Sequence, residues 1–379
     1  MTIHLVVINS TNDTMDVDLF NRKLLETDLE DERQRWIQIS ILFILGILAF
    51  VLNIYVIVTL ARKRYHSVRF SNIDLLILHL GIADILVAGF CVLADAGWKI
   101  TYQWLAGDFM CRAVKYMQMF SLYASTNIIV VISLDRCFAI VNPMPRIDQH
   151  LLVKRMTMAA WIVAGLCSIP QVFVFGVMKA PFETDTGEFY QCVTHGAYTA
   201  KWQETTYVVF TFCVIFALPL LIIIISYVLI FGILHKESHK RSTDIDGPYS
   251  EGHQKVIIAR TQSDTSGVSR LREHTMKKAK TKTLWISVLV ISAFVICWAP
   301  YHLAMILFLS MEKHIDNVDD YKMFQHIFFF GMSNSVANPF IYGVFHMIAR
   351  SKKAYKQRSR RERKNLMLPK TTKSFASVL

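Results

Sequence analysis

The sequence is short of charged residues. Only 18% of its 379 residues are Asp, Glu, Lys or Arg, whereas 53% are hydrophobic. Soluble domains carry about 25% charged residues, so this composition argues against a soluble globular protein. Long uncharged segments account for the shortage, and each of them is long enough as a helix to cross roughly 30 Å of hydrocarbon. The composition therefore predicts a helical membrane protein with several spans.

Several motifs of catalysis and cofactor binding are also missing. The sequence has no Gly-rich phosphate-binding loop, no clustered spacing of metal ligands and no internal repeat. We therefore expect no metal centre and no cofactor, apart from a sodium ion considered below. The opening MTIHLVVI is too short for an ordinary signal peptide and has no basic start. The first membrane helix is accordingly expected to direct export.

Seven apolar segments have the length of a membrane helix. We expect spans near residues 36–60, 73–97, 111–143, 156–177, 205–234, 283–309 and 323–345. The expected fold class is thus an all-α membrane protein, a seven-transmembrane helix bundle over residues 36–345, with a tail at each end (1–35 and 346–379). In the second tail Phe345, Ile348 and Ala349 share one helical face opposite basic residues, which predicts a short amphipathic helix on the membrane surface.

The distribution of charge predicts the orientation in the membrane. Lys and Arg concentrate in alternate connections, including a third inner loop over residues 235–282, and in the C-terminal tail, while the first 35 residues are acidic. The positive-inside rule then places the N-terminus outside the cell. Sequons at Asn9 and Asn12 predict N-glycosylation there. The basic tail suits an anionic lipid leaflet, so we expect a plasma-membrane protein whose partner is the bilayer and not a nucleic acid.

Polar residues inside the spans need an explanation. A carboxylate at the centre of a membrane helix costs about 2.5–3.5 kcal/mol on insertion scales, so Asp84 in the second span requires partners. The candidates lie mid-span in other helices and are Asn53, Ser125, Asn334, Ser335 and Asn338. Such a group either forms interhelical hydrogen bonds alone or also holds a small cation such as sodium. The sequence leaves both readings open.

A second polar group ends the third span. Asp135 and Arg136 lie at its inner edge, where two charges are costly unless they are paired or functional. The alternative is a simple polar stop at the interface. No acid lies between Lys277 and Thr283, so Asp135 is the expected partner of Arg136, in place of an acid from the sixth span. Pro300 and Pro339 predict bends in the last two spans.

Two of the seven cysteines are expected to pair. Cys111 begins the third span on the outer side, and Cys192 lies in the second outer segment, residues 178–204. Both would face an oxidising compartment, so a disulfide between them is geometrically sensible and would attach this segment to the bundle. The other five are expected to pack as small apolar residues.

In this order on seven spans, these residues resemble the rhodopsin-like (class A) G protein-coupled receptors. The match runs from Trp36 to about Arg361 and rests on Asn53, Asp84, Cys111, Asp135-Arg136, Trp161, Cys192, Pro219, Tyr227, Cys297-Trp298-Ala299-Pro300 and Asn338-Pro339-Phe340-Ile341-Tyr342. Cys137 departs from the third letter of the Asp-Arg-Tyr motif, and Leu52 stands where a Gly is usual. The resemblance implies that activation involves Asp135, Arg136, Tyr227, Pro300, Asn338, Pro339 and Tyr342.

Two positions narrow the ligand class. Aminergic receptors have an Asp seven residues after the Cys of the third span, where this chain has Gln118, and opsins have a Lys in the seventh span, which residues 323–345 lack. The stretches WLAGDFMCRAVKYMQMFSLYAST, PQVFVFG and YQCVTH resemble the gonadotropin-releasing hormone, adipokinetic hormone and corazonin receptor group, and the run MQMFSLYAST leans toward invertebrate corazonin-type members. The resemblance implies an extracellular peptide hormone bound by Asp95, Trp98, Lys115, Gln118, Trp298, Tyr301, His302 and Phe308.

The resemblance also implies partners inside the cell. These are a heterotrimeric G protein, expected to be of the Gq class with calcium release, and a receptor kinase and arrestin acting on the tail. The main alternative is a class A receptor for another short peptide, such as a vasopressin-like one. A transporter is disfavoured because Asp84 is essentially the only charge inside the spans. An intramembrane enzyme is disfavoured because His79, His302 and His326 lie on separate spans without a paired acid or thiol.

Overall fold

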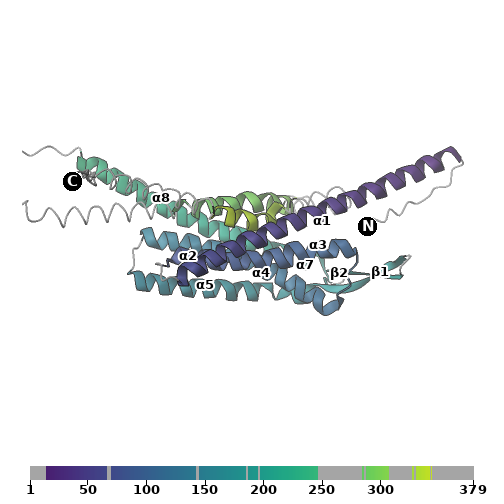
Figure 1. Ribbon diagram of the computed structural model, residues 1–379, viewed down its shortest axis with the longest axis horizontal. Coiled ribbons are helices and arrows are strands. Elements are labelled where there is room, and N and C mark those ends of the chain that lie inside the picture. Colours follow the sequence, from purple (N-terminus) through teal and green to yellow (C-terminus); the bar gives the residue numbers. More distant parts are fainter. Residues whose placement is uncertain are drawn as a thin grey trace, which may run out of the picture.

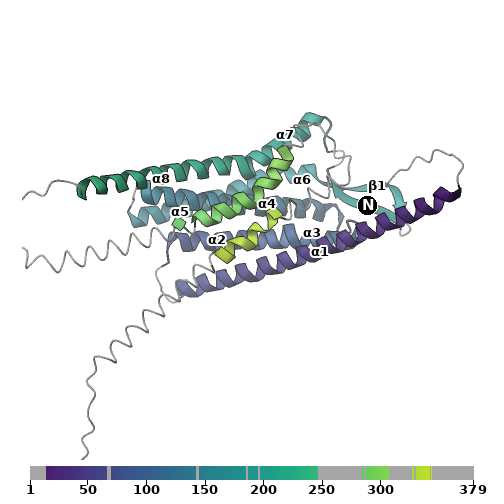
Figure 2. The same cartoon turned by 90° about the horizontal axis from the view of Figure 1, so that it is seen from above.

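The structure, a computed structural model, describes residues 14–65, 70–141, 145–184, 187–194, 197–245, 284–285, 287–306, 327, 330–341 and 343. These residues form an elongated bundle of helices with a small hairpin at one end (Figures 1 and 2). Within them, six helical stretches are long and apolar enough to cross a membrane, namely 32–65, 72–101, 107–141, 147–174, 202–236 and 287–306. The prediction of a helical membrane bundle is confirmed.

The first helix is much longer than its apolar segment. Helix α1 runs from Thr14 to Tyr65, so it begins inside the predicted N-terminal tail, and Figure 1 shows its start projecting beyond the other helices. The hydropathy of the sequence predicted a span over 36–60 only. Hydropathy detects the apolar turns that contact lipid and does not detect the polar turns that continue the same helix. Along the span, Leu42 and Asn53 are buried while Ile44 and Val51 are exposed, as expected of one face toward the bundle and one toward lipid.

The second span is interrupted by a π-helical stretch. Helix α2 (Asn72–Leu86) starts with a capping box in which Ser71 and Asp74 satisfy each other's backbone N–H groups. The π-helix η1 (Val87–Leu93) and helix α3 (Ala94–Thr101) follow without a turn between them. A π-helix changes the direction in which the following residues face, and such segments are frequent at functional sites. Because α3 continues to Thr101, Trp98 lies in a helix, one residue past the predicted end of the span at 97.

Helix α4 (Gly107–Val141) is the central element of the bundle. It contacts α2, α5 (Arg146–Ser168), α6 (Pro170–Val174) and α8 (Leu218–Ile245), and residues 121–126 on it are all buried. The fourth span divides into α5 and α6 at Ile169, where Pro170 takes the first position of the new helix. It ends at Val174, three residues before the predicted 177.

The fifth span also contains a π-helical stretch and runs on past its predicted end. Helix α7 (Lys201–Phe212), π-helix η2 (Cys213–Ala217) and α8 are continuous. The π-helix ends at Ala217, two residues before Pro219, whose missing N–H and bulky ring disturb the hydrogen bonds of the preceding helical turn. Helix α8 continues to Ile245, so the first eleven residues assigned to the third inner loop (235–245) belong to this helix.

A β-hairpin covers one end of the bundle, and the sequence analysis missed it. Strands β1 (Gly176–Thr184) and β2 (Gly187–Val193) pair antiparallel, with Val177 opposite Cys192 and Met178 opposite Gln191. The hairpin contacts α4 through β1. The second outer segment is therefore an ordered structure attached to the third span.

The sixth and seventh spans are described over residues 287–306 and 330–341, both helical apart from one turn residue. Several predicted features lie outside the described residues and stay predictions: the sequons at Asn9 and Asn12, Phe308, Tyr342, the rest of the third inner loop and the amphipathic helix in the tail. Below, the end of the bundle with the hairpin is called the disulfide end, and the end with Arg136 is called the Arg136 end.

Candidate ligand-binding site

A cavity of about 360 Å³ opens among α4, α6, α7 and the sixth span at the disulfide end. Six of the eight side chains predicted to bind ligand line this cavity: Asp95, Lys115, Gln118, Trp298, Tyr301 and His302. Trp98 lies behind Lys115 and is not part of the lining, and Phe308 is outside the described residues. The structure therefore brings together residues that are distant in the sequence but share one cavity.

Two charged residues of the cavity, Lys115 and Asp95, lie near each other. The ammonium of Lys115 lies 4.7 Å from the centre of the Trp98 ring and 5.0 Å from that of Phe175, which is cation–π geometry. Asp95 lies within electrostatic range of both Lys99 and Lys115. The two nearby cations offset part of the cost of burying this carboxylate, which can accept a hydrogen bond from a ligand.

Gln118 is also part of the packing between spans. Its side-chain amide donates to the carbonyl oxygen of Phe90 in the π-helix η1 at 3.0 Å. The thiol of Cys91, in the same π-turn, approaches the carbonyl of Gln118 at 3.4 Å. Gln118 thus connects α4 to the irregular part of the second span, and a change here would alter the shape of the cavity as well as its lining.

The deep wall of the cavity is aromatic. His302 stacks on Phe216 with ring centres 4.6 Å apart, and it also contacts Phe212, Trp298 and Tyr301. The Nε2 atom of His302 is buried without a hydrogen-bond partner among the described residues. A β-carbon placed at Gly331 would lie 3.0 Å from the Trp298 ring, so the seventh span approaches this indole as closely as only a glycine allows.

Sequence reasoning missed several lining residues. Gln171 and Phe175 come from the α6–β1 corner, while Glu204, Tyr207 and Phe212 come from α7. Gln171 donates a hydrogen bond to the Tyr207 hydroxyl and so joins α6 to α7. The one local signal for Gln171 was a polar residue placed directly after Pro170 in an apolar span.

A buried polar cluster lies deeper in the bundle around Asp84. One carboxylate oxygen accepts from the Ser125 hydroxyl at 2.8 Å and the other from the Asn338 amide at 2.9 Å. Asn53 lies elsewhere in the cluster and donates to the backbone oxygens of Ala49 and Ser335 at 2.8 and 3.0 Å. The first, second, third and seventh spans are thus connected through side-chain hydrogen bonds.

At the opposite end, Asp135 is surrounded by donors. It pairs with Arg136, and its second oxygen accepts from Gln149 at 3.2 Å and lies 3.4 Å from the Asn72 amide. His150 contacts the Asn72 side chain at 2.8 Å, so two side chains of the α5 start support this group. The Tyr227 hydroxyl is buried, beside Ser287 and within electrostatic range of Arg136.

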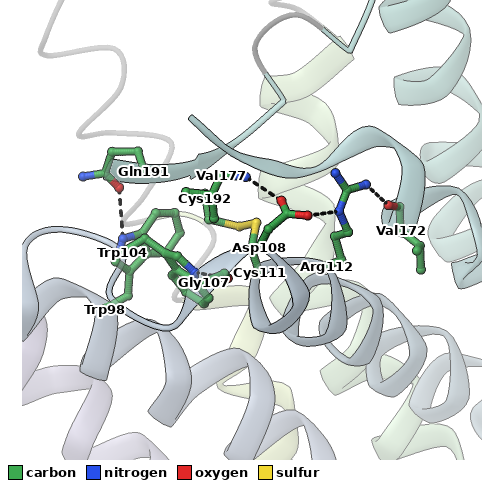
Figure 3. Close-up of a disulfide and its surroundings, with 10 residues drawn as sticks. All are labelled: Trp98, Trp104, Gly107, Asp108, Cys111, Arg112, Val172, Val177, Gln191 and Cys192. Atoms are coloured by element: carbon green, nitrogen blue, oxygen red, sulfur yellow. Dashed lines mark hydrogen bonds and ion pairs between the residues drawn. A yellow bond between two sulfur atoms is a disulfide. The ribbon is translucent and has the colours of Figure 1, made fainter. Parts of the chain in front are cut away.

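The disulfide between Cys111 and Cys192 joins α4 to β2, and Figure 3 shows the side chains gathered around it. Next to it the Gln191 amide accepts from the Trp98 indole at 3.0 Å and donates to the Tyr102 carbonyl at 2.9 Å. Tyr102 has a φ of 64°, which is rare for a side chain of this size. Contacts from the hairpin therefore fix the loop that follows the second span.

The outer part of the hairpin carries a separate exposed ion pair. Lys179 on β1 donates to Glu188 on β2 at 2.6 Å. The hydrogen bond from Lys179 and a second one from the Tyr190 hydroxyl lower the pKa of the Glu188 carboxyl from its ordinary value. The same Lys179–Glu188 hydrogen bond raises the pKa of Lys179. The pair connects the two strands to each other, so it serves below as a matched control.

Comparison with known proteins defines the class. The family model described as "7 transmembrane receptor (rhodopsin family)" matches residues 52–342, and the chain belongs to this family. It is accordingly a multi-pass membrane receptor and not an enzyme, as predicted.

Its relatives narrow the class to one group. The chain is 34% identical over 312 residues to the gonadotropin-releasing hormone receptor of Octopus vulgaris, covering 82% of this chain and 71% of that receptor. It is 32% identical to the gonadotropin-releasing hormone II receptor of Clarias gariepinus (81% of this chain, 75% of the relative) and 30% identical to the gonadotropin-releasing hormone receptor of Rattus norvegicus (82% and 89%). The chain belongs to the receptor group that contains these proteins.

Proposed function

We propose that the chain is a plasma-membrane receptor for a peptide hormone of the gonadotropin-releasing hormone, adipokinetic hormone and corazonin type. The disulfide end faces the outside and the Arg136 end faces the cytoplasm, where a heterotrimeric G protein of the Gq class is engaged and calcium is released. The observation that carries the proposal is the cavity beneath the hairpin, lined by Asp95, Lys115 and the aromatic wall, in a chain similar to gonadotropin-releasing hormone receptors.

The chemistry of the cavity supports a peptide ligand. A largely apolar and aromatic lining with a few polar groups is typical of a small-ligand site, and a volume of about 360 Å³ accommodates a few side chains of a peptide whose remainder lies above. Because Asp95 is flanked by Lys99 and Lys115, the cavity has no single dominant charge on that side. This arrangement suits an aromatic and mostly uncharged peptide better than a cationic amine.

The mechanism that we propose couples the two ends through the sixth span. A peptide seated against Trp298 and Tyr301 favours a conformation in which the sixth span bends outward at Pro300. Arg136 then leaves Asp135 and turns toward Tyr227, and the opened face binds the G protein. The peptide drives this change only as far as it binds the open conformation more tightly than the closed one. Receptor kinase and arrestin are the proposed partners of the Ser- and Thr-containing tail.

We also propose that the Asp84 cluster holds a sodium ion in the resting receptor. The donor set fits a small hard cation, since it offers one carboxylate together with hydroxyl and amide oxygens. The Oδ1 atom of Asn338, whose amide nitrogen donates to Asp84, is buried and accepts no hydrogen bond among the described residues. Raising the sodium concentration should weaken peptide binding, with potassium as the control salt, and Asp84→Asn should remove this effect. Equal effects of the two salts would argue against the ion.

A calcium assay tests the proposed function. Cells that express the chain are challenged with a panel of corazonin, adipokinetic hormone, gonadotropin-releasing hormone and vasopressin-like peptides. We expect calcium release at nanomolar to micromolar concentrations with one of the first three classes. Silence toward the whole panel, with the receptor detected at the cell surface, would contradict the ligand class. A response to vasopressin-like peptides alone would establish the alternative receptor type.

Asp95→Ala tests the cavity itself. Loss of a charged hydrogen bond to the peptide costs about 1.5–3 kcal/mol, which is about a 10- to 100-fold rise in the concentration needed for a half-maximal response. Surface expression should be unchanged, and Glu188→Gln on the exposed hairpin is the control. An unaltered dose response in Asp95→Ala would remove this residue from the binding site.

A further inference from the structure

One partly exposed ion pair at the disulfide end also binds the backbone of neighbouring elements. Arg112 and Asp108 lie one turn apart on α4, with the Nε of Arg112 2.7 Å from a carboxylate oxygen of Asp108. Their side chains are 37% and 51% exposed, and an exposed pair of this kind contributes little by itself. Each of these two side chains, however, also binds a backbone group outside α4: Asp108 binds one in β1, and Arg112 binds one in α6.

Asp108 binds the first strand. Its Oδ1 accepts a hydrogen bond from the backbone N–H of Val177 at 2.9 Å. Val177 lies opposite Cys192 in the hairpin register, and Cys192 is bonded to Cys111 on the same turn of α4. Both strands are thus attached to one turn of one helix at the same rung of the hairpin, β2 by a covalent bond and β1 by a carboxylate (Figure 3).

Arg112 binds the corner before the strand. Its Nη1 donates to the carbonyl oxygen of Val172 in α6 at 2.6 Å. Residues on either side of this carbonyl, Gln171 and Phe175, line the cavity. Gln171 also holds Tyr207 of α7, and Phe175 lies beneath the Lys115 ammonium. The backbone that Arg112 fixes therefore carries two residues of the cavity wall.

The packing around the pair is close. A β-carbon at Gly176 would lie 3.2 Å from the Nη2 of Arg112 and 3.4 Å from the Oδ1 of Asp108. The first contact is tighter than ordinary van der Waals packing, so any larger residue would push against the guanidinium. The glycine at the start of β1 allows the strand to reach the pair.

We infer that Asp108 and Arg112 form a second, non-covalent attachment of the hairpin to α4, and that they are positioning residues for the cavity wall at Gln171 and Phe175. The disulfide fixes β2, and this attachment fixes β1 and the α6–β1 corner. Neither side chain lines the cavity, so their effect on a ligand passes through the backbone of residues 172–177. The part of the inference that concerns ligand rests on the proposed function, whereas the attachment itself does not.

Hydrogen exchange on the full-length receptor in lipid nanodiscs, without ligand, tests the attachment. We expect the Val177 amide to exchange about tenfold faster or more in Asp108→Ala, because its acceptor is lost. Asp108→Asn keeps an oxygen acceptor and should fall between Ala and the parent. The double variant Lys179→Gln/Glu188→Gln, which removes the exposed ion pair between the two strands, should leave Val177 protected. Equal protection of Val177 in Asp108→Ala and in the parent chain would overturn the inference.

Peptide dissociation tests the positioning role. With the most potent peptide of the panel described above, Arg112→Lys and Arg112→Gln should each accelerate dissociation about three- to tenfold, and the Lys179/Glu188 control should not. The effect of Arg112→Gln should shrink when Phe175 is already Leu, because both changes act on the same wall. Additive effects, or unchanged dissociation with normal surface expression, would contradict the positioning role. If no peptide binds the parent receptor, the ligand proposal fails while the exchange result still decides the attachment.

Discussion

The two ends of the bundle are held together in different ways. At the disulfide end a covalent bond, a hairpin, the Gln191 contacts and the Asp108–Arg112 pair attach one segment to α4. At the Arg136 end the described contacts of Asp135 are a single ion pair and hydrogen bonds from neutral amides. The hairpin is thus held partly by a covalent bond, whereas Asp135 is held by non-covalent bonds alone.

Helix α4 belongs to both ends, which makes the contrast informative. The residues that hold the hairpin lie in its first turns, and Asp135 and Arg136 lie near its last turn. Because the hairpin is covalently attached to α4, we expect a bound ligand to leave this end intact and to favour a change at the Arg136 end. This expectation fits a receptor that recognises a ligand at one end and signals at the other.

The largest expected effect comes from removing the covalent bond. Loss of a native disulfide typically costs about 2–5 kcal/mol, so Cys192→Ser should raise the half-maximal peptide concentration by at least about 30-fold or abolish the response. The calcium assay is normalised to receptor at the cell surface, and Cys167→Ser, a free half-buried cysteine, is the control. A normal response from Cys192→Ser would show that the hairpin frame is not needed.

Neutralising Arg136 should reduce signalling without reducing peptide binding. Arg136→Gln removes the charge that Asp135 holds and that Tyr227 is proposed to receive, so peptide should still bind while G protein activation falls by about tenfold or more. Peptide binding and calcium release are measured on the same cells, with Arg155→Gln, an exposed charge of α5, as the control. The comparison breaks down if signalling persists at full strength, or if binding is lost as well.

The Asp84 cluster, which lies between the ends, should show an effect that can be reversed. In Asp84→Asn an NH₂ group can replace the carboxylate oxygen that now accepts from the Asn338 amide. Two donors would then face each other, and an unmatched buried polar pair costs about 1–3 kcal/mol. We expect roughly a tenfold loss of signalling, and the exchange Asp84→Asn/Asn338→Asp should restore part of it. If the double variant is no better than the single one, the direct contact between the two side chains is not what matters.

The smallest expected effect is a gain of resting activity. Gln149→Ala removes one donor to Asp135, worth about 0.5–1.5 kcal/mol, so signalling without peptide should rise by about two- to tenfold. Inositol phosphate accumulation in unstimulated cells measures this, and the neighbouring exposed Asp148→Asn is the control. An unchanged resting level would mean that Gln149 does not help hold the closed state.

Much of the fold was readable from the sequence because the membrane imposes a simple rule. Backbone polar groups in hydrocarbon must be satisfied within a helix, so apolar length alone located the spans. The ends of α1 and α8 were misplaced for the same reason, since their polar turns leave the hydrocarbon while the helix continues. The π-helices η1 and η2 depend on side-chain packing and on Pro219, and they carry no periodic signal of their own.

The site was only partly readable. Asp84 was recognisable because a lone carboxylate in an apolar run demands partners, and Ser125 and Asn338 are the ones that the structure provides. The hairpin was missed because its residues lack strand-like alternation. It is held by contacts to Asp108 and Cys111, and the α6 corner before it is held by Arg112; all three residues are distant from it in the sequence. Gln171 and Tyr207 were missed because their contact joins α6 to α7, which are far apart in the sequence.

Distances between paired spin labels test the contrast between the ends most directly. One pair, at Val141 and Trp285, spans the Arg136 end, and the other, at Phe109 and Met178, spans the disulfide end; all four side chains are exposed. Labels carried on non-natural residues leave the disulfide intact. The account predicts that the most potent peptide of the panel lengthens the first distance and leaves the second unchanged. A second distance that changes while the first stays constant would contradict it.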